Sequence, residues 1–194
     1  TELNETGYGR YEDKCAKILL VIDKTPGVED IQPEVYTGDG GLTLIEKRAY
    51  GVGCCILPST GPSSTAIHNG ICMLAAGNGV IFSPHPGAPK TTFEAIKLMN
   101  EAVREAGGPD NLFFSIKNVT LEKTNDLMHH PHIDMLVATG GPGVVKAALS
   151  SGKKAIGAGP GNPPVLIDET ADIPKAARDI IAGNSFENGI QCNG

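Results

Sequence analysis

The sequence contains no tryptophan, and aromatic side chains make up only 5% of its 194 residues. It has no run of lysine and arginine, and its formal net charge is −6. The lack of a basic cluster argues against a nucleic-acid partner. No apolar stretch reaches the ~18 residues that a membrane span requires, and the polar segment 1–10 does not resemble a signal peptide. These absences favour a soluble enzyme or binding domain.

Metal and disulfide chemistry are also poorly supported by the sequence. No two cysteines form a CxxC pair, which excludes a zinc ribbon and a thioredoxin-type motif. We therefore expect reduced thiols in a cytosolic compartment. The histidine-rich segment 129–132 has only Asp134 as an acidic neighbour, so a solvated turn is a better interpretation than a metal site. The cysteines are Cys15, Cys54, Cys55, Cys72 and Cys192.

Residues 51–158 alternate between short apolar segments and longer amphipathic ones. Thr91 and Glu94 have the spacing of a capping box at the start of one such helix. The apolar segments are typical of strands buried on both faces. This alternation predicts an α/β fold, a Rossmann-like parallel sheet with helices on both faces, forming a nucleotide-binding domain. The expected strands are 52–57, 80–83, 112–116, 135–138 and 155–157.

The segments on either side of this domain have patterns of their own. Residues 1–32 predict an N-terminal helical segment in which Thr6 caps a helix. Residues 33–50 predict a β-hairpin, which we interpret as an oligomerisation arm. Residues 159–194 follow a glycine- and proline-rich break and predict the start of a second, catalytic α/β domain, with a strand at 165–167. Asp172 or Thr170 is expected to cap a helix there.

Three polar loops follow predicted strands. The loop 58–62 offers hydroxyl and backbone N–H groups that can stabilise an oxyanion. The loop 83–86 lies at the edge where open α/β sheets bind ligands. The loop 139–143 opens a helix and can bring N–H groups to a phosphate. Each loop is also compatible with a purely structural turn, and Cys192 is compatible with either a nucleophile or a small buried side chain.

Taken together, these segments resemble the coenzyme A-acylating branch of the aldehyde dehydrogenase superfamily. They recur in the family's order and cover nearly the whole chain. That branch includes propionaldehyde and acetaldehyde dehydrogenases of bacterial microcompartments. The segments that carry the resemblance are ETGYGR at 5–10, TGD at 37–39, PSTGP at 58–62, FSPHP at 82–86, ATGGPG at 138–143, GAGPGNPP at 157–164, DETAD at 168–172 and the segment ending at Cys192.

The resemblance implies roles for individual residues. Cys192 corresponds to the nucleophile, whose thiolate attacks the aldehyde and, after hydride transfer to NAD, carries a thioester. Thr60 stands where hydrolytic members place an oxyanion-hole asparagine. The remaining residues correspond to cofactor contacts, at the adenosine end (Ser83, Pro84, His85 and Pro86) and near the pyrophosphate (Thr139, Gly140, Gly141 and Pro142).

One missing side chain bears on the fate of the thioester. Hydrolytic members carry a water-activating glutamate at the position that aligns with Gly157, and residues 155–164 contain no acidic side chain. Without that base, the thioester should survive until a thiol takes the acyl group. The resemblance therefore implies NAD as cofactor, coenzyme A as co-substrate and a short-chain aldehyde as substrate, although nothing in the sequence separates NAD from NADP.

Three alternatives remain open at this stage: a hydrolytic aldehyde dehydrogenase, the aldehyde half of a bifunctional aldehyde-alcohol dehydrogenase, and a non-catalytic nucleotide-binding fragment. The resemblance implies a cytoplasmic protein, or one housed in a bacterial microcompartment, that forms a homodimer or homotetramer at full length. Cys192 lies two residues from the end of the sequence. Because chain ends are seldom well ordered, we expect this chain alone to have little activity.

Overall fold

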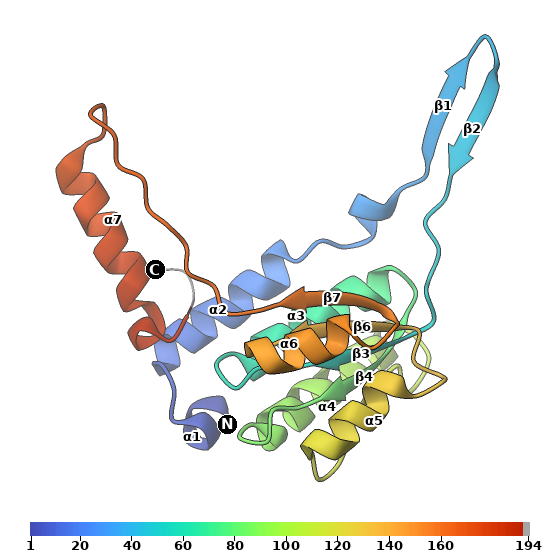
Figure 1. Cartoon of the computed structure of the whole chain (residues 1–194), viewed down its shortest axis with the longest axis horizontal. Coiled ribbons are helices and arrows are strands. Elements are labelled where there is room, and N and C mark those ends of the chain that lie inside the picture. The colour runs from blue at the N-terminus through green and yellow to red at the C-terminus, as the bar shows by residue number, and fades with distance from the viewer. Residues whose placement is uncertain (192–194) are drawn as a thin grey trace.

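The computed structural model describes residues 1–191, and its centre is a parallel five-stranded sheet (Figure 1). The strand order is β5-β4-β3-β6-β7, and every neighbouring pair is parallel. The prediction of a Rossmann-like α/β fold is therefore confirmed. The strands are β3 (Val52–Ile56), β4 (Gly79–Ser83), β5 (Phe113–Ser115), β6 (Met135–Thr139) and β7 (Lys154–Ala158).

Helices cover both faces of this sheet because successive strand residues point to opposite sides. Cys55 packs with side chains of α3 and α4, whereas its neighbour Cys54 packs with side chains of α5 and α6. Burial of each large apolar side chain in these two clusters contributes about 1.5–3 kcal/mol to folding. The four helices are α3 (Pro62–Ala75), α4 (Pro89–Glu105), α5 (Leu121–His129) and α6 (Pro142–Leu149).

Two helices precede the sheet, α1 (Glu2–Thr6) and α2 (Tyr11–Lys24), and a 3-10 turn, η1 (Val28–Ile31), follows them. The prediction that Thr6 caps the long helix is wrong. Thr6 is the last residue of α1, where its Oγ1 donates to the Glu2 carbonyl. Gly7 ends α1 because it adopts a φ of +71°, which favours glycine, and its N–H bonds the Leu3 carbonyl.

The N-terminus of α4 is capped from outside its own helix. The helix begins at Pro89, so Thr91 already lies in its first turn and the predicted capping box is wrong. The carboxylate of Glu5, on α1, accepts hydrogen bonds from the backbone N–H groups of Lys90 (2.8 Å) and Thr91 (2.6 Å). A carboxylate at this position also interacts favourably with the helix dipole. This contact fixes α1 against the start of α4.

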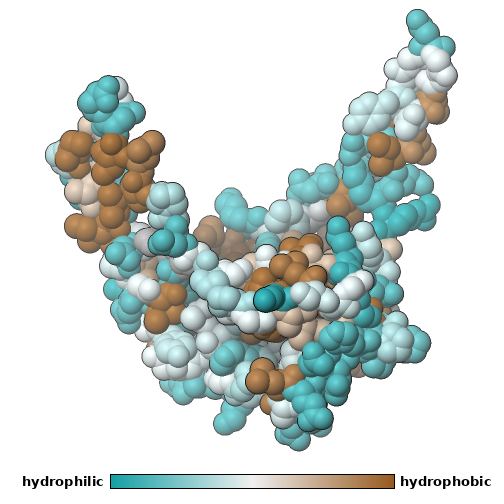
Figure 2. All heavy atoms as spheres, in the orientation of Figure 1, coloured by the Kyte–Doolittle hydropathy of each residue, from teal (hydrophilic) through white to brown (hydrophobic). Residues whose placement is uncertain are grey.

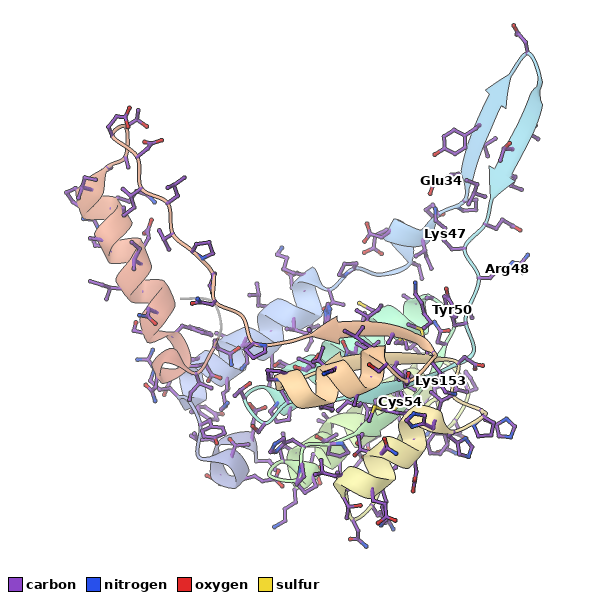
Figure 3. The ribbon with its side chains drawn as sticks, in the orientation of Figure 1. Glu34, Lys47, Arg48, Tyr50, Cys54 and Lys153 are labelled. Atoms are coloured by element: carbon purple, nitrogen blue, oxygen red, sulfur yellow. The ribbon has the colours of Figure 1, made fainter. Side chains whose placement is uncertain are left out.

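Residues 34–45 form the predicted hairpin, in which β1 (Glu34–Gly38) pairs antiparallel with β2 (Gly41–Ile45). The hairpin projects away from the sheet (Figure 1). Glu34 and Lys47 form an ion pair at its base, where Figure 3 shows their labels side by side. The hydrogen bond from Lys47 lowers the pKa of Glu34 below the usual glutamate value.

After β7 the chain runs through irregular backbone to α7 (Ile173–Ser185) and the short turn η2 (Phe186–Gly189). Asp172 caps α7, as predicted, by accepting a 2.9 Å hydrogen bond from the Lys175 N–H. The predicted strand at 165–167 is wrong. A strand needs a partner for its backbone groups, and Leu166 is 95% exposed with no strand paired to this segment among residues 1–191.

Apolar side chains gather on the surfaces of α7 and the hairpin, and Figure 2 shows both as brown regions on projections from the body. Exposed side chains there include Leu42, Leu44 and Ile181. Contiguous exposed apolar surface of this kind marks contact sites for other chain segments or subunits. Within the part of the chain described, no helix has the length and apolar character to cross a membrane.

Candidate functional site

The three loops singled out in the sequence lie along one edge of the sheet. They follow the carboxyl ends of β4, β3 and β6, which are consecutive neighbours in the strand order. The order of strands along the chain reverses between β3 and β6. Open α/β sheets bind ligands in the crevice at such a reversal. The fold therefore brings the predicted loops together at the position that favours ligand binding.

The loop after β3 contacts the segment that leads to Cys192. Thr60 is half-buried, and its carbonyl accepts a 3.3 Å hydrogen bond from Nε2 of Gln191. Gln191 immediately precedes Cys192 in the sequence. Cys192 itself lies outside the described residues. The structure thus brings the predicted oxyanion loop and the approach to the predicted nucleophile together, although they are far apart in sequence.

The loop after β4 places its residues unequally. The Ser83 side chain is buried, and its hydroxyl is hydrogen-bonded to the Thr124 hydroxyl of α5 at 2.9 Å. Pro84 is also buried, whereas His85 and Pro86 are exposed. The backbone N–H of Gly87 donates to Nδ1 of His85 at 3.0 Å. A ligand at this loop would therefore meet His85 and Pro86 rather than the Ser83 hydroxyl.

A cavity of about 560 Å³ opens beside this loop. One wall is apolar, from Pro86 and Phe93, and two cations, Lys90 and Lys117, also line it. No carboxylate is among the lining residues. Lys90 and Phe93 belong to the first turns of α4, directly after a loop that the sequence did indicate. Lys117 follows β5, and no sequence motif marks it. Pro89, Asn118 and Val119 complete the lining.

The loop after β6 is built for close backbone approach. Thr139 ends the strand, and the N–H of Gly140 donates to the Ala158 carbonyl of β7 at 3.1 Å. Gly141 precedes α6 and provides no side-chain cap. Pro142, the first residue of α6, has no N–H, so the N–H groups of the next two residues are the ones that a helix start leaves for a ligand. Such N–H groups suit a phosphate oxygen.

Gly157, on β7, lies close to side chains of α6. A Cβ atom built on Gly157 would lie 2.7 Å from Cγ1 of Val145 and 3.4 Å from Cδ1 of Leu149. Any side chain at this position would require the Val145 side chain to move. At the position where the resemblance implies the loss of a water-activating glutamate, the backbone is therefore exposed, but the direction in which a side chain would point is occupied by α6.

The other cysteines and histidines form no comparable site. Burial raises the pKa of Cys54 to about 12, and burial also raises the pKa of Cys55. Both thiols are therefore protonated at neutral pH and poor nucleophiles. Cys15 is exposed on α2. His129 bonds the Asn125 carbonyl at 2.9 Å, and residues 1–191 contain no cluster of three metal-ligating side chains.

A buried ionic cluster joins the two ends of the chain, and sequence analysis missed it. The Glu187 side chain is 0% exposed and accepts hydrogen bonds from the ammonium groups of Lys17 (2.7 Å) and Lys14 (3.1 Å). Lys14 also donates to Glu2 at 2.6 Å, and Glu2 in turn accepts from the Ser63 hydroxyl. We refer to Glu2, Lys14, Lys17 and Glu187 as the ionic cluster. Burial raises the pKa of Glu187, but the two lysines lower that pKa by more than burial raises it. The net shift of the Glu187 pKa is therefore downward.

The backbone beside this cluster is held in an unfavourable conformation. Glu187 and Asn188 have φ values of +52° and +57°, and Gly189 follows at +73°. Left-handed backbone costs about 1–2 kcal/mol for each residue that carries a side chain. Contacts with the N-terminal segment offset this cost: the Glu187 N–H donates to Asp13 at 2.8 Å, and the Asn188 amide donates to the Gly9 carbonyl at 3.2 Å.

The parallel sheet with helices on both faces defines a Rossmann-like α/β fold. The chain belongs to the aldehyde dehydrogenase family, whose family model matches residues 17–194. It is 50% identical over 191 residues to the acetaldehyde dehydrogenase (acetylating) EutE of Salmonella typhimurium. It is also 50% identical over 189 residues to the propanal dehydrogenase (CoA-propanoylating) of the same organism.

These alignments cover 98% and 97% of this chain, respectively, but in each case only 41% of the relative's length. A solved structure gives the same picture. The propionaldehyde dehydrogenase from the Clostridium phytofermentans fucose utilisation bacterial microcompartment is 53% identical and superposes with a TM-score of 0.94. That match covers 98% of this chain and 44% of the solved one. The chain thus spans less than half of the relatives that it resembles.

Proposed function

We propose that the protein carrying these residues oxidises a short-chain aldehyde to an acyl-coenzyme A, with NAD as the hydride acceptor and Cys192 as the nucleophile. The observation that carries the proposal is the meeting of the Thr60 loop with Gln191, the residue before Cys192. In this reaction the Cys192 thiolate adds to the aldehyde carbonyl and forms a thiohemiacetal. Hydride then passes from the thiohemiacetal carbon to NAD and leaves a thioester on Cys192. The coenzyme A thiol takes the acyl group from that thioester, and Cys192 is released as the thiol.

Coenzyme A rather than water is proposed as the acyl acceptor because of Gly157. A general base must lie within hydrogen-bonding reach of the water that it activates. Residues 155–164 provide no carboxylate, and Gly157 itself packs against α6. The relatives whose names specify acetylating or CoA-propanoylating activity agree with this proposal.

The proposed experiment uses the complete reading frame that contains these residues, with propanal, NAD and coenzyme A. We expect NADH to form together with propanoyl-coenzyme A, and Cys192→Ala to abolish both. Free propanoate formed without coenzyme A would instead support the hydrolytic alternative. NAD binding without any turnover would support the non-catalytic alternative. The 194-residue chain alone is expected to give little NADH.

We also propose that the cavity beside the loop after β4 holds the adenosine end of the cofactor, with His85 and Pro86 at its rim. Phe93 offers an apolar surface, and Lys90 and Lys117 offer positive charge without a competing carboxylate. Such a lining tolerates a phosphate on the ribose. Titration calorimetry with NAD and NADP should therefore show that Lys117→Met weakens NADP binding more than NAD binding. An equal loss for both would contradict this placement of the ribose.

The pyrophosphate is proposed to lie at Thr139–Pro142, where α6 begins. We further propose residues 51–158 as the nucleotide-binding domain and residues 159–194 as the start of the catalytic domain.

The exposed apolar side chains of the hairpin support its role as an oligomerisation arm. Sedimentation of the complete protein should show a dimer or tetramer that Leu42→Lys weakens. Residence in the cytoplasm or in a microcompartment is tested by fractionation.

A further inference from the structure

From the ionic cluster we infer that Lys17 and Glu187, through Gln191, are positioning residues that hold the segment leading to Cys192 against the Thr60 loop. The inference rests on the proposed function, because it assigns these residues to the geometry of the proposed nucleophile. Neither Lys17 nor Glu187 belongs to any of the three predicted loops. Its basis is a chain of contacts that runs from α2 to the edge of the sheet.

The first step in that chain is the attachment of Glu187 to α2. The carboxylate of Glu187 is fully buried, and Oε2 accepts from Lys14, Lys17 and Gln191. Lys17 is only 12% exposed in its side chain, so its ammonium depends on Glu187 for its charge partner. Breaking a buried ion pair from one side leaves an uncompensated charge in the interior. The cluster therefore resists displacement of Glu187.

The second step is the link from Glu187 to the loop after β3. One side-chain amide, Nε2 of Gln191, donates both to Glu187 Oε2 and to the Thr60 carbonyl, each at 3.3 Å. The position of the residue before Cys192 is thus set jointly by α2 and by the Thr60 loop. A purely structural ion pair would not require this connection to the sheet edge.

The third step is the fit around the carboxylate. Oε1 of Glu187 is buried and has no hydrogen-bond partner among residues 1–191. Gly9 packs directly beside it, and a Cβ atom on Gly9 would overlap the carboxylate. Gly9 also has a φ of +78°, which disfavours any other residue. The GYG turn before α2 therefore makes room for Glu187, and the two ends of the chain are shaped to each other.

The test compares four variants of the complete protein: Glu187→Gln, Gln191→Met, Lys17→Arg and the control Asp179→Asn. The control breaks an exposed ion pair with Lys175 on α7, close to the cluster in sequence but outside it. Single-turnover NADH formation is measured with saturating aldehyde. A displacement of reacting groups by 1 Å can slow a reaction by about 100-fold. We expect a loss of about that size for Glu187→Gln, a smaller loss for Gln191→Met, and near-normal rates for Lys17→Arg and Asp179→Asn.

Two further readouts separate positioning from loss of fold. The KM for NAD should stay within about twofold of the parent value, because the cofactor loops are untouched; a 1.4 kcal/mol change would move it tenfold. The alkylation rate of Cys192 relative to Cys15, followed by mass spectrometry, should change severalfold in Glu187→Gln and not in Asp179→Asn. The alkylation readout does not depend on turnover.

The outcomes are distinguishable. Unchanged turnover and unchanged Cys192 alkylation in a folded Glu187→Gln protein would overturn the inference. So would equal losses in Glu187→Gln and Asp179→Asn. If Glu187→Gln fails to fold, Gln191→Met compared with Asp179→Asn decides by the same measurements, and normal turnover and alkylation in Gln191→Met would overturn the inference. If even the parent protein makes no NADH, the proposed function fails, and the alkylation ratio alone decides whether the ionic cluster positions the cysteine segment.

Discussion

At the residue scale, the space beside Gly157 restricts which side chains this position can hold. Its Cα–H faces Val145 across a gap too small for a methyl group, since a Cβ atom would lie 2.7 Å from Val145 Cγ1. Overpacking of this kind typically costs about 1–3 kcal/mol. We expect Gly157→Ala to lower the free energy of unfolding by that amount, measured by urea denaturation.

Gly159→Ala provides the matched control for this substitution. Gly159 lies two residues further along the same segment, and a Cβ atom there would meet nothing within 4 Å. Its unfolding free energy should stay within about 0.5 kcal/mol of the parent value. Equal destabilisation by the two substitutions would show that the close approach to α6 is not what restricts position 157.

The cysteines allow a second prediction at this scale. Burial raises the pKa of Cys54 to about 12 and also raises that of Cys55, whereas Cys15 is exposed. At pH 8 iodoacetamide should alkylate Cys15 in the native protein and leave Cys54 and Cys55 unmodified. The three thiols should react alike in urea. Rapid native labelling of Cys54 would contradict the buried strand β3.

Sequence analysis found the loops of the site but not the side chains that hold them. Thr60, His85 and Gly141 lie in motifs with local composition signals. Glu187 and Lys17 carry no such signal, because the two partners are 170 residues apart and a charged residue is usually solvated. Only the folded chain brings them together. The sequence alone also did not predict that the Ser83 hydroxyl is buried against α5.

At the scale of elements, α4 depends on a capping group from another helix. The Glu5 carboxylate accepts from the N–H groups of Lys90 and Thr91. Burial raises the pKa of Glu5, but the hydrogen bonds from Thr91 and Lys90 outweigh burial and lower the pKa overall. We expect Glu5→Ala to reduce the thermal midpoint and to cost about 1 kcal/mol. Glu122→Ala is the control, since Glu122 lies in the first turn of α5 without such a bond.

The elements themselves were largely predictable. Apolar strands separated by amphipathic helices predicted the sheet because this pattern is local and repeated. The predictions failed where a contact from elsewhere in the chain, a single backbone conformation or a missing partner strand decided the outcome. Glu5 replaced the capping box expected at Thr91, and Gly7 ended α1 where Thr6 was expected to start a helix. The apolar segment 165–167 lacked a neighbouring strand and stayed irregular.

At the scale of the whole molecule, several carboxylates favour the folded state only while ionised. The pKa values of Glu5, Asp13 and Glu187 are all lowered by hydrogen bonds or nearby cations, which outweigh burial. A carboxylate whose pKa is lower in the folded state than in the unfolded state stabilises the fold. The full contribution is present above the unfolded-state pKa, which is about 4.5 for glutamate. It is lost as the pH falls through the folded-state pKa. We expect the urea midpoint to fall steadily from pH 5 to pH 3.

Glu187→Gln tests the source of that dependence. The variant has one fewer ionisable carboxylate in the ionic cluster, so its urea midpoint should depend less steeply on pH over the same interval. Asp179→Asn, on the exposed ion pair of α7, should keep the parent's pH dependence. A parent protein whose stability is constant between pH 5 and pH 3 would contradict the ionised state assigned to these groups.

The contact between Lys14 and Glu187 spans 173 positions of a 194-residue chain. Contacts of such high sequence separation slow folding because a long loop must close before they form. Within the sheet, the pairing with the largest separation joins Gly53 of β3 to Met135 of β6, which is a smaller separation. Docking of the first two helices onto the last turn is therefore expected to be a late kinetic event. During synthesis, Lys14 and Lys17 cannot form their buried ion pairs until Glu187 has left the ribosome.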